Sequence, residues 1–213
     1  MALLIFDLDG TLIDSRLDLA HAVNATRVKM GMPELPYETI YGYVGNGAPV
    51  LIRRALGPAA APDDVEAALA FFLDYYTQHA VVRTELYPGV RHALENLHVA
   101  GHNLAVLTNK PVRISLSIMG HFDLARLMSR IYGGNSFEQK KPHPIGIDTL
   151  RRELNAGRED TWMVGDSGVD VQTARNAGVR VCGVTWGFQP ESLREFPPDL
   201  LVDRIEDFAV RFL

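Results

Sequence analysis

The stretch Leu3-Leu4-Ile5-Phe6-Asp7-Leu8-Asp9-Gly10-Thr11-Leu12 decides the fold of this chain. Its first four residues form an unbroken apolar run, which predicts a strand buried on both faces, as in a parallel sheet. Asp7 and Asp9 follow two residues apart, so on an extended backbone both side chains leave the same face. Gly10 marks the turn that ends the strand. Because open α/β sheets bind ligands at the carboxyl ends of their strands, the two acids predict a functional site.

An Asp-x-Asp-Gly sequence also opens calcium-binding EF-hand loops. That pattern continues with a further acid or amide, a glycine and a glutamate, whereas Thr11, Leu12 and Asp18 stand at those positions. A plain turn-forming role accounts for one acid of the pair more readily than for both.

Composition and charge exclude several classes of protein. The chain has 213 residues, 47% hydrophobic and 22% charged, which is typical of a core domain with a smaller insertion. A net charge of −5 without a basic stripe argues against nucleic acid as a partner. No apolar stretch approaches the roughly 20 residues that span a bilayer, and the start of the chain lacks a signal-peptide pattern. Cys182 is the only cysteine, so we expect a cytoplasmic protein with no membrane partner.

Residues from about 15 to 81 predict an all-helical insertion. The expected helices cover about 16–30, 37–43, 50–56 and 62–79. Glycine and proline end or begin several of them, as capping preferences require. In the first helix the spacing predicts one apolar face made by Leu17, Ala20, Val23 and Val28.

From Tyr87 onward strands and helices alternate. The expected strands are 104–107, 130–132, 161–164, 179–185 and 200–202, and the helices are 90–100, a segment after 111, 144–154 and 169–177. This order predicts right-handed crossovers and a parallel sheet. The fold class is therefore a doubly wound α/β core, residues 1–14 and 82–213, with a helical cap inserted over residues 15–81.

Polar residues follow several of these strands and share an edge of the sheet with Asp7. One strand leads into Thr108-Asn109, for which helix capping before Pro111 is an equal alternative. Another leads into Gly165-Asp166-Ser167-Gly168-Val169-Asp170, with its two acids one helical turn apart. In Lys140-Lys141-Pro142-His143-Pro144 the prolines fix the backbone and hold Lys141 in place, while Lys140 is expected to be solvated.

Electrostatics predicts a bound ion if Asp7, Asp9, Asp166 and Asp170 converge. Each close pair repels by about 4 kcal/mol at 4 Å and an effective dielectric near 20. Lys141 alone cannot offset several such pairs, whereas a hard divalent cation can. Mg²⁺ prefers carboxylates, water and phosphate, so the site predicts Mg²⁺ together with a phosphorylated substrate. No Cys or His cluster with zinc spacing competes.

The order Asp-x-Asp, Thr, Lys-Pro and Gly-Asp-x-x-x-Asp resembles the four motifs of the haloacid dehalogenase superfamily. The resemblance implies that Asp7 is a nucleophile that forms an aspartyl-phosphate. It implies that Asp9 is the general acid and then the general base. Dehalogenases of the superfamily lack this second acid, so Asp9 favours phosphoryl transfer over carbon–halogen hydrolysis.

The resemblance also implies roles for the other strand ends. Thr108 and Asn109 would bind phosphoryl oxygens, and Lys141 would neutralise the nucleophile and the transferring group. The implied metal ligands are the side chains of Asp7 and Asp166 and the backbone carbonyl of Asp9. Asp170 would support this shell.

Further stretches are similar to bacterial phosphoglycolate phosphatases: Gly45-Asn46-Gly47-Ala48, Thr108-Asn109-Lys110-Pro111 and Gly183-Val184-Thr185-Trp186-Gly187. In that family the Gly45-Asn46-Gly47 loop closes over the site and reads the leaving group; an ordinary turn between helices is an equal alternative. Arg53 or Arg54 could bind a substrate carboxylate, although paired helical arginines are usually just solvated.

The sequence therefore predicts a Mg²⁺-dependent phosphatase for a small phosphorylated metabolite, 2-phosphoglycolate first. A sugar phosphomutase of β-phosphoglucomutase type is the nearest alternative, and another small phosphomonoester is a third substrate class. A phospho-receiver signalling module shares the acidic pocket but gives no reason for the helical insertion. A monomer and a homodimer are both compatible with the sequence.

Overall fold

A computed structural model describes residues 1–213 and divides them into two compact units. Met1–Asp14 and Leu86–Leu213 form the larger unit, and Ser15–Glu85 form the smaller, helical unit. The helical unit extends four residues beyond the expected end at 81, because Asp18 binds the returning chain. Its carboxylate accepts the backbone N–H groups of Arg83 and Thr84 at 2.8 to 3.0 Å.

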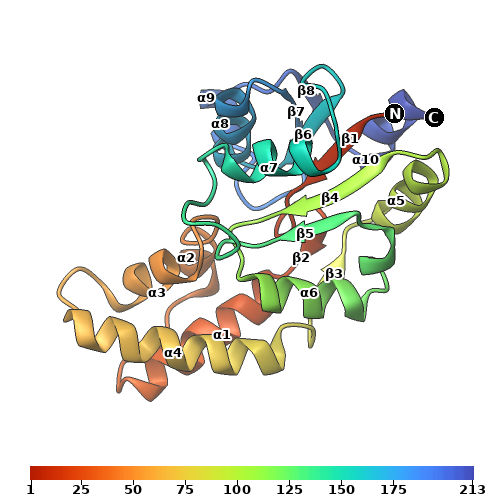
Figure 1. Ribbon diagram of the computed structural model, residues 1–213. Helices are drawn as coiled ribbons and strands as arrows, with labels where there is room; N and C mark the ends of the chain where they lie inside the picture. The colour runs from red at the N-terminus through yellow and green to blue at the C-terminus, as the bar shows by residue number, and fades with distance from the viewer. The chain divides into compact units, whose positions relative to one another are not determined.

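The larger unit is built on a six-stranded parallel sheet in the order β5-β4-β1-β6-β7-β8 (Figure 1). The strands are β1 (Leu3–Phe6), β4 (Asn103–Leu107), β5 (Arg130–Tyr132), β6 (Thr161–Gly165), β7 (Arg180–Val184) and β8 (Leu200–Val202). The chain moves outward from β1 to β5 on one side, then returns past β1 to begin the other side. Such a switch point beside β1 is where doubly wound sheets bind ligands.

Helices connect these strands as the sequence predicts, with two additions. The helices are α5 (Val90–Val99), α6 (Val112–His121), α7 (Ile145–Glu153), α8 (Gly168–Ala177), α9 (Ser192–Glu195) and α10 (Ile205–Ala209), with 3₁₀ turns η1 (Ala125–Leu127) and η2 (Val210–Phe212). The sequence analysis missed α9 and α10, because one turn of helix is too short to display a helical period.

Strand β1 is buried on both faces, which explains its unbroken apolar run. Leu3 and Ile5 belong to a hydrophobic core cluster that also contains Ile147 of α7 and Val171 of α8. Phe6 points to the opposite face, and its ring packs edge-to-face on Phe208 of α10 at 6.2 Å between centroids. Burying each large apolar side chain contributes about 1.5–3 kcal/mol, so β1 anchors the residues that follow it.

The helical unit contains α1 (Arg16–Lys29), α2 (Tyr37–Tyr41), α3 (Ala48–Leu56) and α4 (Pro62–His79), coloured orange to yellow in Figure 1. Two short strands, β2 (Ile13–Asp14) and β3 (Glu85–Leu86), pair with each other where the chain passes between the units. None of the helices in the structure combines the length and apolar character that a membrane crossing requires.

The expected apolar face of α1 is wrong at two positions. Leu17 and Val28 are 43% and 57% exposed, while Asn24 and Arg27 are buried. The reason is hydrogen bonding to the loop that follows the helix. Asn24 exchanges two hydrogen bonds with the backbone of Leu35, and Arg27 Nε donates to the Pro33 carbonyl at 2.7 Å. Polar groups satisfied in this way displace two apolar residues from the buried face.

Candidate active site

The register of the sheet brings three strand ends together. Phe6 of β1 pairs with Val106 of β4 on one side and with Val164 of β6 on the other. The next residues along each strand therefore end at the same edge. The Asp7 N–H continues the ladder by donating to the Val164 carbonyl at 2.9 Å.

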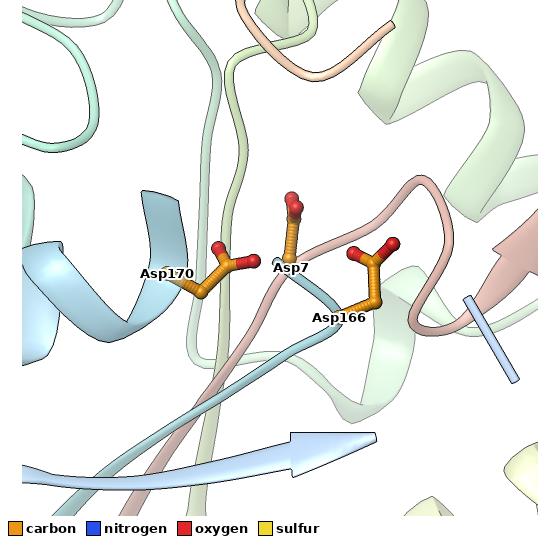
Figure 2. Close-up of side chains that lie close together, drawn as sticks. All are labelled: Asp7, Asp166 and Asp170. Carbon is orange, nitrogen blue, oxygen red and sulfur yellow. The ribbon is translucent and has the colours of Figure 1, made fainter. Parts of the chain in front are cut away.

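Three carboxylates gather at this edge. Asp7, Asp166 and Asp170 each offer an oxygen, and these atoms all lie within 4.8 Å of one another. Figure 2 shows Asp7 between the other two, with Asp170 on the first turn of α8. Asp166 and Asp170 are buried. Carboxylate oxygens at this spacing are the donor set that hard divalent cations prefer.

Lys141 bridges two of the acids. Its Nζ lies 2.9 Å from Asp7 Oδ2 and 2.6 Å from Asp170 Oδ1, and its side chain is almost fully buried. Burial alone would lower the pKa of the Lys141 ammonium, but the charges of Asp170 and Asp7 outweigh burial and raise it. Lys141 is thus a permanent cation beside Asp7.

Asp170 is held by a capping box at the start of α8. Its Oδ2 accepts the Ser167 hydroxyl at 2.7 Å and the Ser167 N–H at 3.2 Å, while Oδ1 accepts Lys141. With both oxygens engaged, Asp170 serves to position Lys141. The sequence analysis missed Ser167, although Ser-x-x-Asp before a helix is a readable capping signal.

Asp166 is held by a loop that the sequence analysis did not single out. Its Oδ2 accepts the backbone N–H groups of Phe188 at 2.6 Å and Gln189 at 3.3 Å. A Cβ atom on Gly10 or on Gly187 would overlap the Asp166 carboxyl group. Gly10 also has φ +81, a conformation that other residues rarely adopt. Both glycines therefore make room for this acid.

The acids carry strongly shifted pKa values. Burial raises the pKa of Asp7 to about 6, against the opposing attraction of Lys141. Burial and repulsion from Asp170 and Asp7 raise the pKa of Asp166 to about 8. Both shifts mean that burial and neighbouring carboxylates make the charged forms of these acids costly, a cost that additional positive charge would relieve.

Asp9 departs from the expectation that four carboxylates converge. Both of its oxygens contact Lys110 Nζ, at 2.9 and 3.1 Å, and its carboxylate is not part of the three-acid cluster. The extended strand ends at Phe6, and the backbone then turns, with the Leu12 N–H donating to the Leu8 carbonyl at 3.0 Å. The strict alternation of side chains therefore stops before Asp9.

Lys110 also corrects the expectation that one lysine serves the site. Its side chain is only 3% exposed. Lys110 lies in the stretch Thr108-Asn109-Lys110-Pro111, but the sequence analysis gave it no role. When all are ionised, four carboxylates and two ammonium groups leave two uncompensated negative charges. The set is Asp7, Asp9, Asp166 and Asp170 with Lys110 and Lys141. The residues present therefore fit a divalent cation.

Thr108 and Asn109 lie in this cluster of loops rather than capping α6. The first residue outside α6 is Pro111, and no side chain caps the helix there. Thr108 Oγ1 accepts the Lys110 N–H at 3.2 Å, which leaves its own O–H free to donate. Asn109 Nδ2 donates to the Lys141 carbonyl at 3.1 Å and so ties two of the loops together.

The predicted substrate residues of the helical unit form one segment. Gly45, Asn46 and Gly47 directly precede α3, and the two glycines have positive φ. Arg53 and Arg54 stand in the last turn of α3, and both are exposed. Arg54 Nη1 lies 3.3 Å from the Tyr43 carbonyl oxygen.

The structure shows an α/β protein with a cluster of acids and two buried lysines at the carboxyl ends of its parallel strands. The chain belongs to the haloacid dehalogenase-like hydrolase family, whose family model matches residues 4–184. The predicted family, α/β fold and class of enzyme, a phosphoric monoester hydrolase, are confirmed by this match and by the relatives that follow.

Curated relatives cover nearly the whole chain. A phosphoglycolate phosphatase from Vibrio parahaemolyticus is 36% identical over 96% of this chain and 93% of its own length. Phosphoglycolate phosphatase 1 from Pseudomonas aeruginosa is 38% identical over 96% of this chain and 77% of its own length. A crystal structure described as a predicted phosphoglycolate phosphatase from Haemophilus somnus has a TM-score of 0.95 at 32% identity, covering 100% of this chain and 98% of that one.

Proposed function

We propose that this chain is a Mg²⁺-dependent cytoplasmic phosphatase that hydrolyses 2-phosphoglycolate through an aspartyl-phosphate on Asp7. The observation that carries the proposal is the setting of Asp7. One of its oxygens is paired with the buried Lys141 at 2.9 Å, and its carboxylate lies within 4.8 Å of two further acids. The names of the relatives support the choice of substrate, and the single buried Cys182 agrees with a reducing compartment.

In the first step a carboxylate oxygen of Asp7 attacks phosphorus, and the bond from phosphorus to the ester oxygen breaks. Asp9 donates a proton to that oxygen, so glycolate leaves as a neutral alcohol. In the second step Asp9 takes a proton from water, the water oxygen attacks phosphorus, and phosphate leaves Asp7 unmodified. Asp7 is thereby a covalent nucleophile and Asp9 a general acid and base.

Charge on the transferring group is stabilised by fixed donors. The Thr108 hydroxyl retains its proton for donation because its oxygen accepts from Lys110 N–H. Lys141 is oriented by Asp170 and remains charged. Preorganised donors of this kind stabilise the transition state more than the ground state. Asn109 is proposed as a further phosphoryl contact, as the sequence analysis suggested.

The metal would be held by the carboxylates of Asp7 and Asp166 and by the backbone carbonyl of Asp9. When bound, Mg²⁺ supplies positive charge that attracts and orients the phosphoryl oxygens. The backbone N–H groups of Phe188 and Gln189 fix Asp166 for this purpose. Orienting hydrogen bonds behind metal ligands commonly set metal affinity.

Specificity is proposed to reside in the helical unit. Gly45, Asn46 and Gly47 would read the leaving group, and Arg53 would bind the substrate carboxylate. Arg54 on the same turn is the matched control, because both residues are exposed arginines of α3. Arg53→Ala should raise the KM for 2-phosphoglycolate but not for a phosphoester without a carboxylate, whereas Arg54→Ala should raise neither.

The test is release of phosphate from a panel of phosphorylated metabolites with and without Mg²⁺. The panel includes 2-phosphoglycolate and β-glucose 1-phosphate, and products are analysed as well as phosphate. We expect preferential hydrolysis of 2-phosphoglycolate that stops when the metal is chelated. Conversion of the sugar phosphate to its isomer would identify a mutase instead, and stoichiometric labelling without turnover would indicate a receiver module.

A further inference from the structure

We propose that Lys110 is the positioning residue for Asp9, so that leaving-group protonation depends on a lysine one residue beyond the phosphate-binding pair. The proposal rests on the proposed function, since it requires Asp9 to be the general acid. The observation that suggests it is the two-point contact of Lys110 Nζ with both Asp9 oxygens, at 2.9 and 3.1 Å.

The burial of Lys110 argues against a purely solvated ion pair. Its side chain is 3% exposed, and that of Asp9 is 15% exposed. Lysine is rarely buried to this degree unless it is paired. Replacing a buried ion pair by apolar residues is often neutral or stabilising, so stability alone gives little reason to place a lysine here.

The backbone of Lys110 is fixed as firmly as its side chain. Its N–H donates to Thr108 Oγ1 at 3.2 Å, and its carbonyl accepts the Gly134 N–H at 2.8 Å. A Cβ atom on Gly133 or Gly134 would overlap the backbone of residues 109–112. The two glycines therefore allow their loop to pack closely against residues 109–112, which fixes the backbone of Lys110.

Asp9 lies beyond the end of its strand. The strand ends at Phe6, Asp9 forms only an isolated bridge with Ile13, and the next residue, Gly10, has φ +81, so no continuous strand or helix orients the Asp9 side chain. A general acid must lie within hydrogen-bond reach of the leaving oxygen. The fixed ammonium group of Lys110 orients the Asp9 carboxylate, just as the fixed carboxylate of Asp170 orients the Lys141 ammonium group.

The test compares two leaving groups in single turnover with excess enzyme and Mg²⁺. Release of glycolate from 2-phosphoglycolate requires a proton for the leaving oxygen, whereas release of p-nitrophenolate from p-nitrophenyl phosphate does not. The variants are Lys110→Met, Lys110→Arg, Asp9→Asn and the double variant Lys110→Met with Asp9→Asn. Thermal unfolding is recorded for each, and Lys110→Gln replaces Lys110→Met if the latter does not fold.

We expect Lys110→Met to slow glycolate release by about 10- to 100-fold, because misplacing a reacting group by 1 Å can cost up to about 10²-fold. The p-nitrophenolate burst should change by less than about 3-fold, because that leaving group needs no proton. Lys110→Arg keeps a positive charge that can bind both carboxylate oxygens, so it should retain more of the glycolate rate than Lys110→Met. In the Asp9→Asn background Lys110→Met should add less than about 3-fold, because residues that act as one unit are not additive.

Equal loss with both leaving groups would overturn the inference, since Lys110 would then act on the phosphoryl group or on the fold. Loss in Asp9→Asn with none in Lys110→Met would also overturn it and leave the proposed function intact. Full glycolate release by Asp9→Asn would instead remove the acid role of Asp9, and the failure would then lie with the proposed function.

Discussion

Asp7 and Asp9 stand two residues apart at the end of one strand, but their surroundings differ. Asp7 lies within 4.8 Å of two other acids and shares Lys141 with one of them. Asp9 is turned aside and is bound through both oxygens by Lys110. The comparison teaches that sequence spacing places two acids at one strand end, while the partners from other loops divide the roles between them.

The largest effect should come from removing the nucleophile. Asp7→Asn should lower turnover by at least ~10³-fold, as expected for loss of a covalent nucleophile. The variant should remain folded, because burial already disfavours the charged form of Asp7. Steady-state phosphate release and thermal unfolding measure both points. Asp148→Asn, at an exposed position of α7, is the control and should keep full turnover.

The next largest effect should come from Asp170, which orients Lys141. Asp170→Asn should lower turnover by about 10–100-fold, the usual range for residues that orient a site from behind. Ser167→Ala should have a smaller effect, because the Ser167 N–H still binds Asp170 at 3.2 Å. Both variants should slow p-nitrophenyl phosphate and 2-phosphoglycolate alike, unlike Lys110→Met. If Asp170→Asn lost activity only with 2-phosphoglycolate, Lys141 and Lys110 would not have the separate roles proposed for them.

A smaller effect should follow from crowding Asp166. Gly187→Ala places a Cβ atom where the Asp166 carboxyl group lies, so Mg²⁺ affinity should fall by about 10-fold, within the range for perturbed metal surroundings. Gly120→Ala is the matched control, because nothing lies within 4 Å of the new Cβ atom there. Calorimetric titration with Mg²⁺ measures both. Unchanged affinity in Gly187→Ala would show that Asp166 does not hold the metal.

The pH dependence of stability tests the surroundings of Asp166 without reference to turnover. Without a bound ion, the pKa of Asp166 is raised from 3.8 to about 8. The folded state therefore retains a proton that the unfolded chain releases, and this stabilisation is complete below pH 3.8 and lost as the pH rises through 8.

Asp166→Asn mimics the protonated acid and lacks this dependence. In metal-free buffer, the free energy of unfolding of the wild type minus that of Asp166→Asn should fall steadily between pH 5 and pH 8. Urea unfolding at several pH values provides the measurement. A difference that rises with pH would mean that the folded site favours the charged carboxylate even without a metal.

Much of the fold follows from local signals in the sequence. The helix expected over 62–79 is α4 (Pro62–His79), because proline at its first position and two early acids define its start. The strand expected over 130–132 is β5. The predicted apolar face of α1 was wrong, because the burial of Asn24 and Arg27 depends on hydrogen bonds to backbone groups of the loop that follows the helix. Periodicity cannot reveal such partners.

The site divides in the same way. The sequence located the acids because they lie just beyond strands or in the first turn of a helix, and Lys141 because it stands beside a proline. The structure brings Lys141 together with Asp7, Asp166 and Asp170. It missed the hydrogen bonds from Phe188 and Gln189 to Asp166, because these residues donate through their backbone N–H groups. The identity of a side chain does not reveal such a contact. It missed Lys110, because nothing local in the sequence shows that this side chain is buried against Asp9, 101 residues away along the chain.

The most direct test is to trap the phosphorylated enzyme during turnover. The enzyme is mixed with 2-phosphoglycolate and Mg²⁺, quenched in acid and digested, and the peptide that contains Asp7 and Asp9 is analysed by fragmentation mass spectrometry. We predict one phosphoryl group on Asp7 in the wild type, little in Asp9→Asn, because formation of the phosphoenzyme from 2-phosphoglycolate needs a proton for the leaving oxygen, and none in Asp7→Asn. A phosphoryl group on any other residue, or turnover by Asp7→Asn at the wild-type rate, would contradict the central claim.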